Sequence, residues 1–148
     1  MKVIHAHEGF YTLNFERGDE VMTGLAAFAQ ENGIRAAHLG GLGAAAHLVL
    51  AYYNLDTKEY ERQVLDENVE ILSLQGNIGV KESGETVVHL HGTFGRRDLS
   101  VFGGHVFELV ISGAGEVHLA SFPGTVNRAY DEATGLTLMC PAAPGAEL

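Results

Sequence analysis

One helical segment followed by a long series of strand-like segments is the pattern that most restricts the fold of this chain. The helix is expected to begin after Gly18-Asp19, where Asp19 can cap the first turn, and to end at Asn32-Gly33. Turn residues at Asp56-Thr57-Lys58 and at Glu82–Glu85 join strands into hairpins. One helix with about eight strands and short turns predicts an α+β domain on a largely antiparallel sheet. The expected strands are Phe10–Phe15, Ile34–Leu39, Ala46–Asn54, Glu59–Leu65, Val69–Leu74, Thr86–Phe94, His105–Ser112 and Glu116–Phe122.

Glycines fall at the expected junctions between these strands. Gly40-Gly41-Leu42-Gly43 lacks the G-x-G-x-x-G spacing of a phosphate-binding loop, and no helical pattern begins after it. We therefore interpret it as a turn between two strands, and Gly113-Ala114-Gly115 in the same way. Because the chain shows no internal repeat and no linker, we expect a single domain over residues 1–148.

The charge and cysteine content narrow the classes of function. Nine basic and nineteen acidic residues give a net charge of -10, which disfavours non-specific binding to nucleic acid. The single Cys140 excludes a disulfide within the chain and fits a reducing compartment. Since no segment is apolar and long enough for a signal peptide or a bilayer span, we expect a soluble cytoplasmic protein without membrane contact.

Three histidines in two short motifs predict a metal site. In a strand, residues two apart point to the same face, so His89-Leu90-His91 places two imidazoles side by side. Gly103-Gly104 allows close backbone approach, and a return strand starting at His105 can then bring a third imidazole to the pair. Three imidazoles with one open position are a common arrangement for catalytic zinc, whereas structural zinc normally has four protein ligands.

Other readings of the histidines remain open at this point. A His-x-His pair in an apolar strand can also be two hydrogen-bonded histidines of a core or an interface. His5-Ala6-His7 repeats the pattern near the terminus, where fraying and exposure are the default. The isolated histidines are interpreted as ordinary packed or surface residues; they are His38, His47 and His118.

The order of several motifs resembles the PPC domain, the plants-and-prokaryotes conserved domain that is also found in plant AT-hook proteins. The resemblance covers nearly the whole chain, and the combination is specific although each piece alone is weak. The matching segments are Gly18-Asp19-Glu20-Val21 with the helix that follows, Gly33-Ile34-Arg35-Ala36-Ala37, Val69-Glu70-Ile71-Leu72-Ser73-Leu74-Gln75-Gly76, His89-Leu90-His91, and Gly103-Gly104-His105 through Gly115-Glu116-Val117 to Phe122-Pro123.

The resemblance implies a compact α+β domain that assembles as a homotrimer. It also implies that His89, His91 and His105 match the histidines that gather a divalent metal ion, usually assigned as zinc, in bacterial and archaeal members. Members of this family are commonly described as DNA-binding, but in plant members the contact is attributed to an Arg-Gly-Arg-Pro hook outside the domain. No such tetrapeptide occurs in this chain, so we expect no nucleic-acid binding by the isolated chain.

Three functions fit these features. The first is a trimeric metal-binding module for assembly or sensing, and the second is a zinc-dependent enzyme that acts on a small molecule or anion at the metal. The third, a DNA-associated regulator, would need a partner or a basic segment. An enzyme would also need a proton-transfer group, for which Glu70 and Glu108 are candidates. We interpret Glu70 as a buried structural pairing and Glu108 as a side chain facing solvent, so neither receives a role and the catalytic residues stay unknown.

Overall fold

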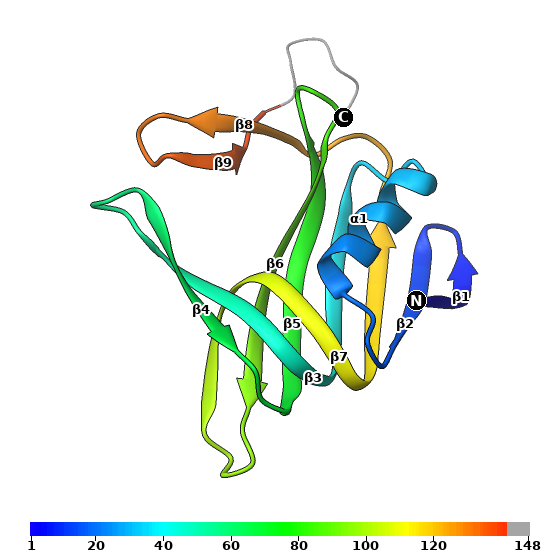
Figure 1. Ribbon diagram of the computed structural model, residues 1–148. Coiled ribbons are helices and arrows are strands. Elements are labelled where there is room, and N and C mark those ends of the chain that lie inside the picture. The colour runs from blue at the N-terminus through cyan, green and yellow to red at the C-terminus, as the bar shows by residue number, and fades with distance from the viewer. Residues whose placement is uncertain (142–148) are drawn as a thin grey trace.

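The computed structural model describes residues 1–141, and within these residues nine strands form one sheet that carries a single helix (Figure 1). All paired neighbours are antiparallel except β5 and β8, which run parallel. This confirms the α+β class with a largely antiparallel sheet. The elements are β1 (Lys2–His7), β2 (Phe10–Glu16), α1 (Val21–Glu31), β3 (Ala37–Asn54), β4 (Glu59–Leu65), β5 (Val69–Lys81), β6 (Thr86–Gly95), β7 (Val101–Ser121), β8 (Asn127–Asp131) and β9 (Leu136–Met139).

Four of the strands close into a ring around the core. Both β3 and β6 pair with β5 and with β7, so each of the four strands has two partners within the set. Their inward side chains are buried, and the buried face of α1 joins the same hydrophobic cluster. Because side chains alternate along a strand, the outward positions of these strands remain free for function. The largest buried side chains of the ring are Leu39, Leu48, Leu74, Ile78, Leu90, Phe94, Leu109, Ile111 and Leu119.

The glycine clusters do not form turns, which corrects the sequence interpretation. Gly40–Gly43 lies inside β3, and Gly113–Gly115 lies inside β7. The pairing of β3 shifts register between Gly41 and Gly43, and Gly43 has a φ of +149° that other residues rarely adopt. Such irregularities bend a strand without ending its pairing. Each predicted pair of short strands is therefore one long bent strand.

The N-cap of the helix lies one residue later than predicted. Glu20, not Asp19, is the N-cap: its carboxylate accepts hydrogen bonds from the backbone N–H groups of Met22 at 3.0 Å and Thr23 at 2.7 Å. It also accepts the N–H of Leu109 on β7 at 3.0 Å, which the shorter Asp19 side chain, engaged with the N-terminal ammonium, does not reach. The predicted end at Asn32-Gly33 is confirmed.

Three strands were not expected from the sequence. The terminal segment with His5 and His7 pairs with β2 as β1 instead of fraying, and β8 and β9 form a hairpin near the C-terminal end of the described residues. In Figure 1 this hairpin projects to the same side as the hairpin of β3 and β4. No helix within residues 1–141 has the length and apolar character needed to cross a membrane.

Candidate metal centre

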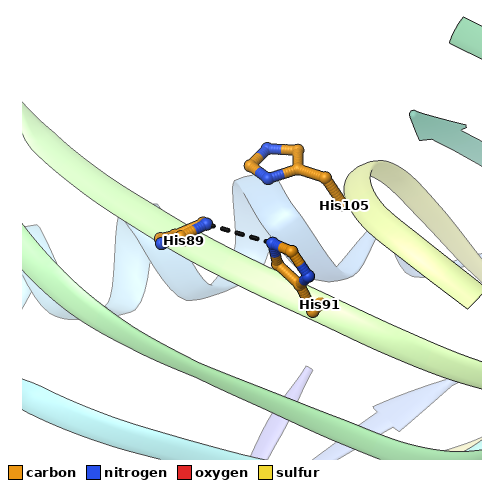
Figure 2. A group of neighbouring side chains, drawn as sticks. All are labelled: His89, His91 and His105. Atoms are coloured by element: carbon orange, nitrogen blue, oxygen red, sulfur yellow. Dashed lines mark hydrogen bonds between the residues drawn. The ribbon is translucent and has the colours of Figure 1, made fainter. Parts of the chain in front are cut away.

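The three predicted histidines meet on the outer face of β6 and β7. His89 and His91 flank Leu90, which is 1% exposed and points into the core, so both imidazoles stand on the opposite face. His105 lies directly across from His91 in the β6–β7 ladder. Figure 2 shows the three rings converging on one point. Strand alternation and register together thus produce the cluster that the spacing predicts.

The distances within this cluster suit a small ion. One potential ligand atom from each histidine lies within 4.8 Å of the other two. The Nε2 atoms of His89 and His91 are 3.3 Å apart. Two nitrogens of a tetrahedral zinc site with bonds of about 2.0–2.1 Å would be separated by roughly 3.4 Å. This pair therefore already has the spacing of two zinc ligands, and the group could hold a metal ion.

Glycines bring the two strands together at the centre. Gly104 pairs with Gly92, and Gly103 pairs with Thr93. A Cβ atom at Gly103 would overlap the carbonyl oxygen of Gly92, and one at Gly104 would lie 3.0 Å from the carbonyl oxygen of Ala51. The predicted close approach is confirmed, although β7 begins at Val101, so that His105 is inside the strand and not its first residue.

Burial favours the neutral form of two of the imidazoles, those of His89 and His105. It lowers the pKa of His105 to about 4, with smaller contributions from the other two histidines. Burial also lowers the pKa of His89, and the positive charge of Arg128 lowers it further to a smaller extent. Because a metal ligand must offer a free lone pair, a neutral imidazole at pH 7 is the form that a divalent ion needs.

The low pKa of His105 can be measured in metal-free protein. We expect its ring protons to titrate near pH 4 in an NMR experiment, against 6.5 for the unperturbed side chain. Between these values the unfolded chain binds more protons than the folded chain, so the stability of the apoprotein should fall as pH drops from 6.5 to 4. A His105 midpoint at or above 6.5 would contradict this environment.

A cavity of about 890 Å³ opens beside the three histidines. Both hairpins contribute to its walls: Tyr53 and Tyr60 come from β3 and β4, and Arg128 and Leu136 come from β8 and β9. The hairpins are tied together where the Tyr53 hydroxyl donates to the carbonyl oxygen of Thr134 at 2.6 Å. All three histidines line this cavity, so any additional ligand of a bound ion would come from it.

The other sequence candidates lie elsewhere. Glu70 is exposed on β5, not buried as interpreted, because it alternates with the buried Val69 and Ile71. Glu108 is exposed as expected, with 58% of its side chain accessible, and pairs with His47 at 3.5 Å. Neither carboxylate lines the cavity. The histidines outside the cluster lie on other strands: His5 and His7 on β1, His38 and His47 on β3, and His118 on β7.

Two residues of the centre were missed from the sequence. Arg128 is only 6% exposed, and its Nη2 atom lies 3.4 Å from Nδ1 of His89. The ring of Tyr60 lies 4.9 Å from that of His105, measured between centroids. A lone arginine and a tyrosine on a hairpin carry no motif, and only the folded arrangement brings them to the histidines.

Comparisons with known proteins agree with this architecture. The metal-containing protein from Archaeoglobus fulgidus is 33% identical, with a TM-score of 0.82 over 95% of this chain and 100% of that chain. A plant- and prokaryote-conserved protein from Pyrococcus horikoshii is 29% identical, with a TM-score of 0.82 over 90% and 92%. A proposed DNA-binding protein from Bacteroides thetaiotaomicron is 31% identical, with a TM-score of 0.87 over 92% and 94%.

No curated protein matches the chain. The model of the Plants and Prokaryotes Conserved domain matches residues 6–123, a range that runs from β1 through the end of β7 and includes all three histidines of the cluster. The resemblance read from the motifs is thus confirmed, and the chain belongs to the Plants and Prokaryotes Conserved domain family.

Proposed function

We propose that this chain is a metal-binding protein that holds one divalent ion, zinc, through His89, His91 and His105. The observation that carries the proposal is the convergence of three imidazoles, with ligand atoms within 4.8 Å of one another, on the wall of a cavity. Imidazole is a good ligand for zinc, and three histidines with an open position are typical of zinc sites that bind a further molecule. The description of the Archaeoglobus fulgidus relative as metal-containing supports the same conclusion.

X-ray absorption of the zinc-loaded protein tests the coordination. Three nitrogen ligands at about 2.0–2.1 Å and at least one ligand that is not a protein side chain are expected. An absence of bound metal after exposure to zinc would refute the proposal. A fourth protein ligand would instead make the site a closed, structural one.

The cavity favours small-molecule binding as the role of the metal, either for sensing or for catalysis. A bound zinc ion can activate water or polarise a carbonyl group. For catalysis, Tyr60 replaces Glu70 and Glu108 as the candidate proton-transfer residue, because it lines the cavity beside His105. Burial raises the pKa of Tyr60 above its ordinary value, so the hydroxyl is protonated at neutral pH and would act as a hydrogen-bond donor or general acid.

We further propose that the protein assembles as a homotrimer. The family resemblance motivates this proposal, and exposed apolar side chains on the ring of strands support it. Leu42 on β3, Leu72 on β5 and Val101 on β7 are 54%, 51% and 59% exposed. Burying such side chains between subunits would be favourable. Light scattering at micromolar concentration should give three times the mass of one chain, and the mass of a monomer or a dimer would contradict the trimer.

DNA binding by the isolated chain is not part of this proposal, although the Bacteroides thetaiotaomicron relative is described as a proposed DNA-binding protein. Affinity for duplex DNA requires clustered basic residues, with a salt slope of about -0.9 per neutralised phosphate. Nine basic residues are dispersed among nineteen acidic ones here. We expect no salt-sensitive binding to a DNA duplex near physiological ionic strength. A micromolar complex that weakens steeply with added salt would favour a regulator instead.

A further inference from the structure

The second ring nitrogen of His89 faces a cation. Nδ1 of His89 lies 3.4 Å from Nη2 of Arg128, while Nε2 lies 3.3 Å from Nε2 of His91. Both contacts are satisfied together only when the His89 proton is on Nε2. In that tautomer Nδ1 accepts from the guanidinium and Nε2–H donates to His91. The metal-free centre thus forms one chain of hydrogen bonds from Arg128 to His91.

A metal ion at Nε2 would break this chain. The His89 proton must then move to Nδ1, where the N–H points at a guanidinium that can only donate. Histidines that bind metals almost always donate their other N–H to a carboxylate, a carbonyl oxygen or water. Within residues 1–141, the side chain that lies against this nitrogen is a donor. In the metal-bound form, an acceptor for this N–H would come from water or from a ligand in the cavity.

Arg128 is held firmly in this position. Its Nη1 donates to the carbonyl oxygen of Thr137 at 3.1 Å, and its Nη2 donates to Oδ1 of Asn77 at 2.6 Å. Its Nε is buried beside Gly79 and makes no hydrogen bond within the described residues. No carboxylate among residues 1–141 forms an ion pair with this guanidinium. A buried charge without a counter-ion is costly, so Arg128 is suited to receive an anion.

The charges and the apolar side chains of the cavity suit an anion with an apolar part. Its one acidic lining residue, Glu85, is paired with Lys81 at 2.8 Å, so the charge of Arg128 is not neutralised there. This positive site belongs to a chain with a net charge of -10, which makes it a local exception. Apolar side chains form much of the remaining wall. They include Val87, Phe107, Leu136 and Leu138.

We propose that this cavity binds a small organic carboxylate at Arg128, beside the metal, and that metal and carboxylate bind cooperatively. The inference rests on the proposed metal site. One carboxylate oxygen accepts from Nδ1–H of His89 and from Arg128, and thereby removes the conflict between the two donors. The apolar wall takes the aliphatic part of the molecule, which favours an organic acid over inorganic phosphate.

Linkage between the two ligands tests this inference. We expect saturating isobutyrate to tighten zinc binding to the wild-type protein by roughly 5–150-fold in a chelator competition, the usual range for coupled sites. Inorganic phosphate at the same concentration should have a much smaller effect. By reciprocity, zinc should tighten the binding of isobutyrate by the same factor in calorimetry, a measurement that needs no variant.

Two arginine variants locate the effect. Arg128→Gln should lose the coupling, so that its zinc affinity is the same with and without isobutyrate, and thermal unfolding of the apoprotein should show that the variant is folded. Arg62→Gln is the matched control, since Arg62 stacks on Phe107 of the same wall at 3.9 Å without contacting His89. It should keep the coupling. Loss of the coupling in both variants would indicate that any nearby positive charge produces it, and would overturn the assignment to Arg128.

The outcomes separate this inference from the metal site itself. If wild-type protein binds no zinc with or without isobutyrate, the proposed function is wrong. If zinc binds but isobutyrate leaves its affinity unchanged, the carboxylate site is wrong and the metal site stands. Equal effects of phosphate and isobutyrate would overturn the assignment to an organic acid.

Discussion

The substitution His91→Ala should remove zinc from the protein almost completely under conditions in which wild type binds one ion per chain. His91 supplies one of three imidazoles, and its Nε2 is 3.3 Å from that of His89. Losing a group that only supports a metal ligand typically costs about 10–100-fold in affinity, so losing a ligand should cost more than about 100-fold. Metal content and chelator competition measure the effect.

The reason for choosing His91 is that its imidazole is exposed and belongs to no part of the hydrophobic core. Exposed substitutions usually change the free energy of unfolding by less than about 0.5 kcal/mol. The apoprotein of His91→Ala should therefore melt close to the wild-type apoprotein. Loss of zinc can then be attributed to the missing ligand and not to unfolding.

His5→Ala and His7→Ala are the matched controls, because they repeat the His-x-His spacing on an exposed strand. Both residues lie on β1, outside the cluster of possible ligands. Each variant should bind zinc as wild type does. Equal loss of zinc in all three variants would show that the terminal pair, or both pairs, hold the ion.

The histidine cluster was predictable because its geometry depends on local rules. Residues two positions apart on a strand share a face, which places His89 beside His91. The third member needed one non-local fact, that His105 pairs with His91, and the close approach allowed by Gly103-Gly104 indicated it. The spacing of these two motifs therefore indicated which three histidines meet, and the register of β6 and β7 confirms it.

The rest of the site depends on contacts between distant segments. Arg128 reaches His89 because β8 pairs in parallel with β5, where Lys81 is its register partner, and no periodic pattern encodes that pairing. Strands β8 and β9 themselves were also missed from the sequence, because β8 joins the sheet through only two register pairs with β5, and these leave no pattern in the sequence. The proposed carboxylate site depends on this unpredicted part, because Arg128 lies in it.

The glycines were misread for a related reason. In isolation, Gly40–Gly43 indicates a break, because glycine weakens strands. In the fold, β3 keeps partners on both sides through this segment, and the pairing compensates for the low local propensity. Glu70 was likewise placed inside from its apolar neighbours, although strict alternation puts it outside. In both cases, strand pairing and alternation determined the structure more than local composition did.

Gly76→Ala should be the most damaging small substitution near the histidine cluster. Gly76 pairs with Leu90 on β6, between His89 and His91. A Cβ atom there would overlap the carbonyl oxygen of His89 and lie 2.9 Å from Cδ1 of Leu90. The carbonyl belongs to a backbone held in the sheet, so the strands must separate. Overpacking of this kind typically costs about 1–3 kcal/mol, and we expect the upper end, about 3 kcal/mol.

Thermal unfolding at fixed protein concentration measures the loss, which should lower Tm by roughly 6–12 °C for a domain of this size. Zinc affinity should fall as well, because the displaced backbone carries His89. Gly113→Ala is the matched control: it lies within β7, and its added Cβ would meet only the Cβ of Ala44, at 4.0 Å. That variant should stay within about 0.5 kcal/mol of wild type. If both variants melt together near the wild-type temperature, the β5–β6 pair has more room than the structure shows, and His89 is held less rigidly than a preformed metal site requires.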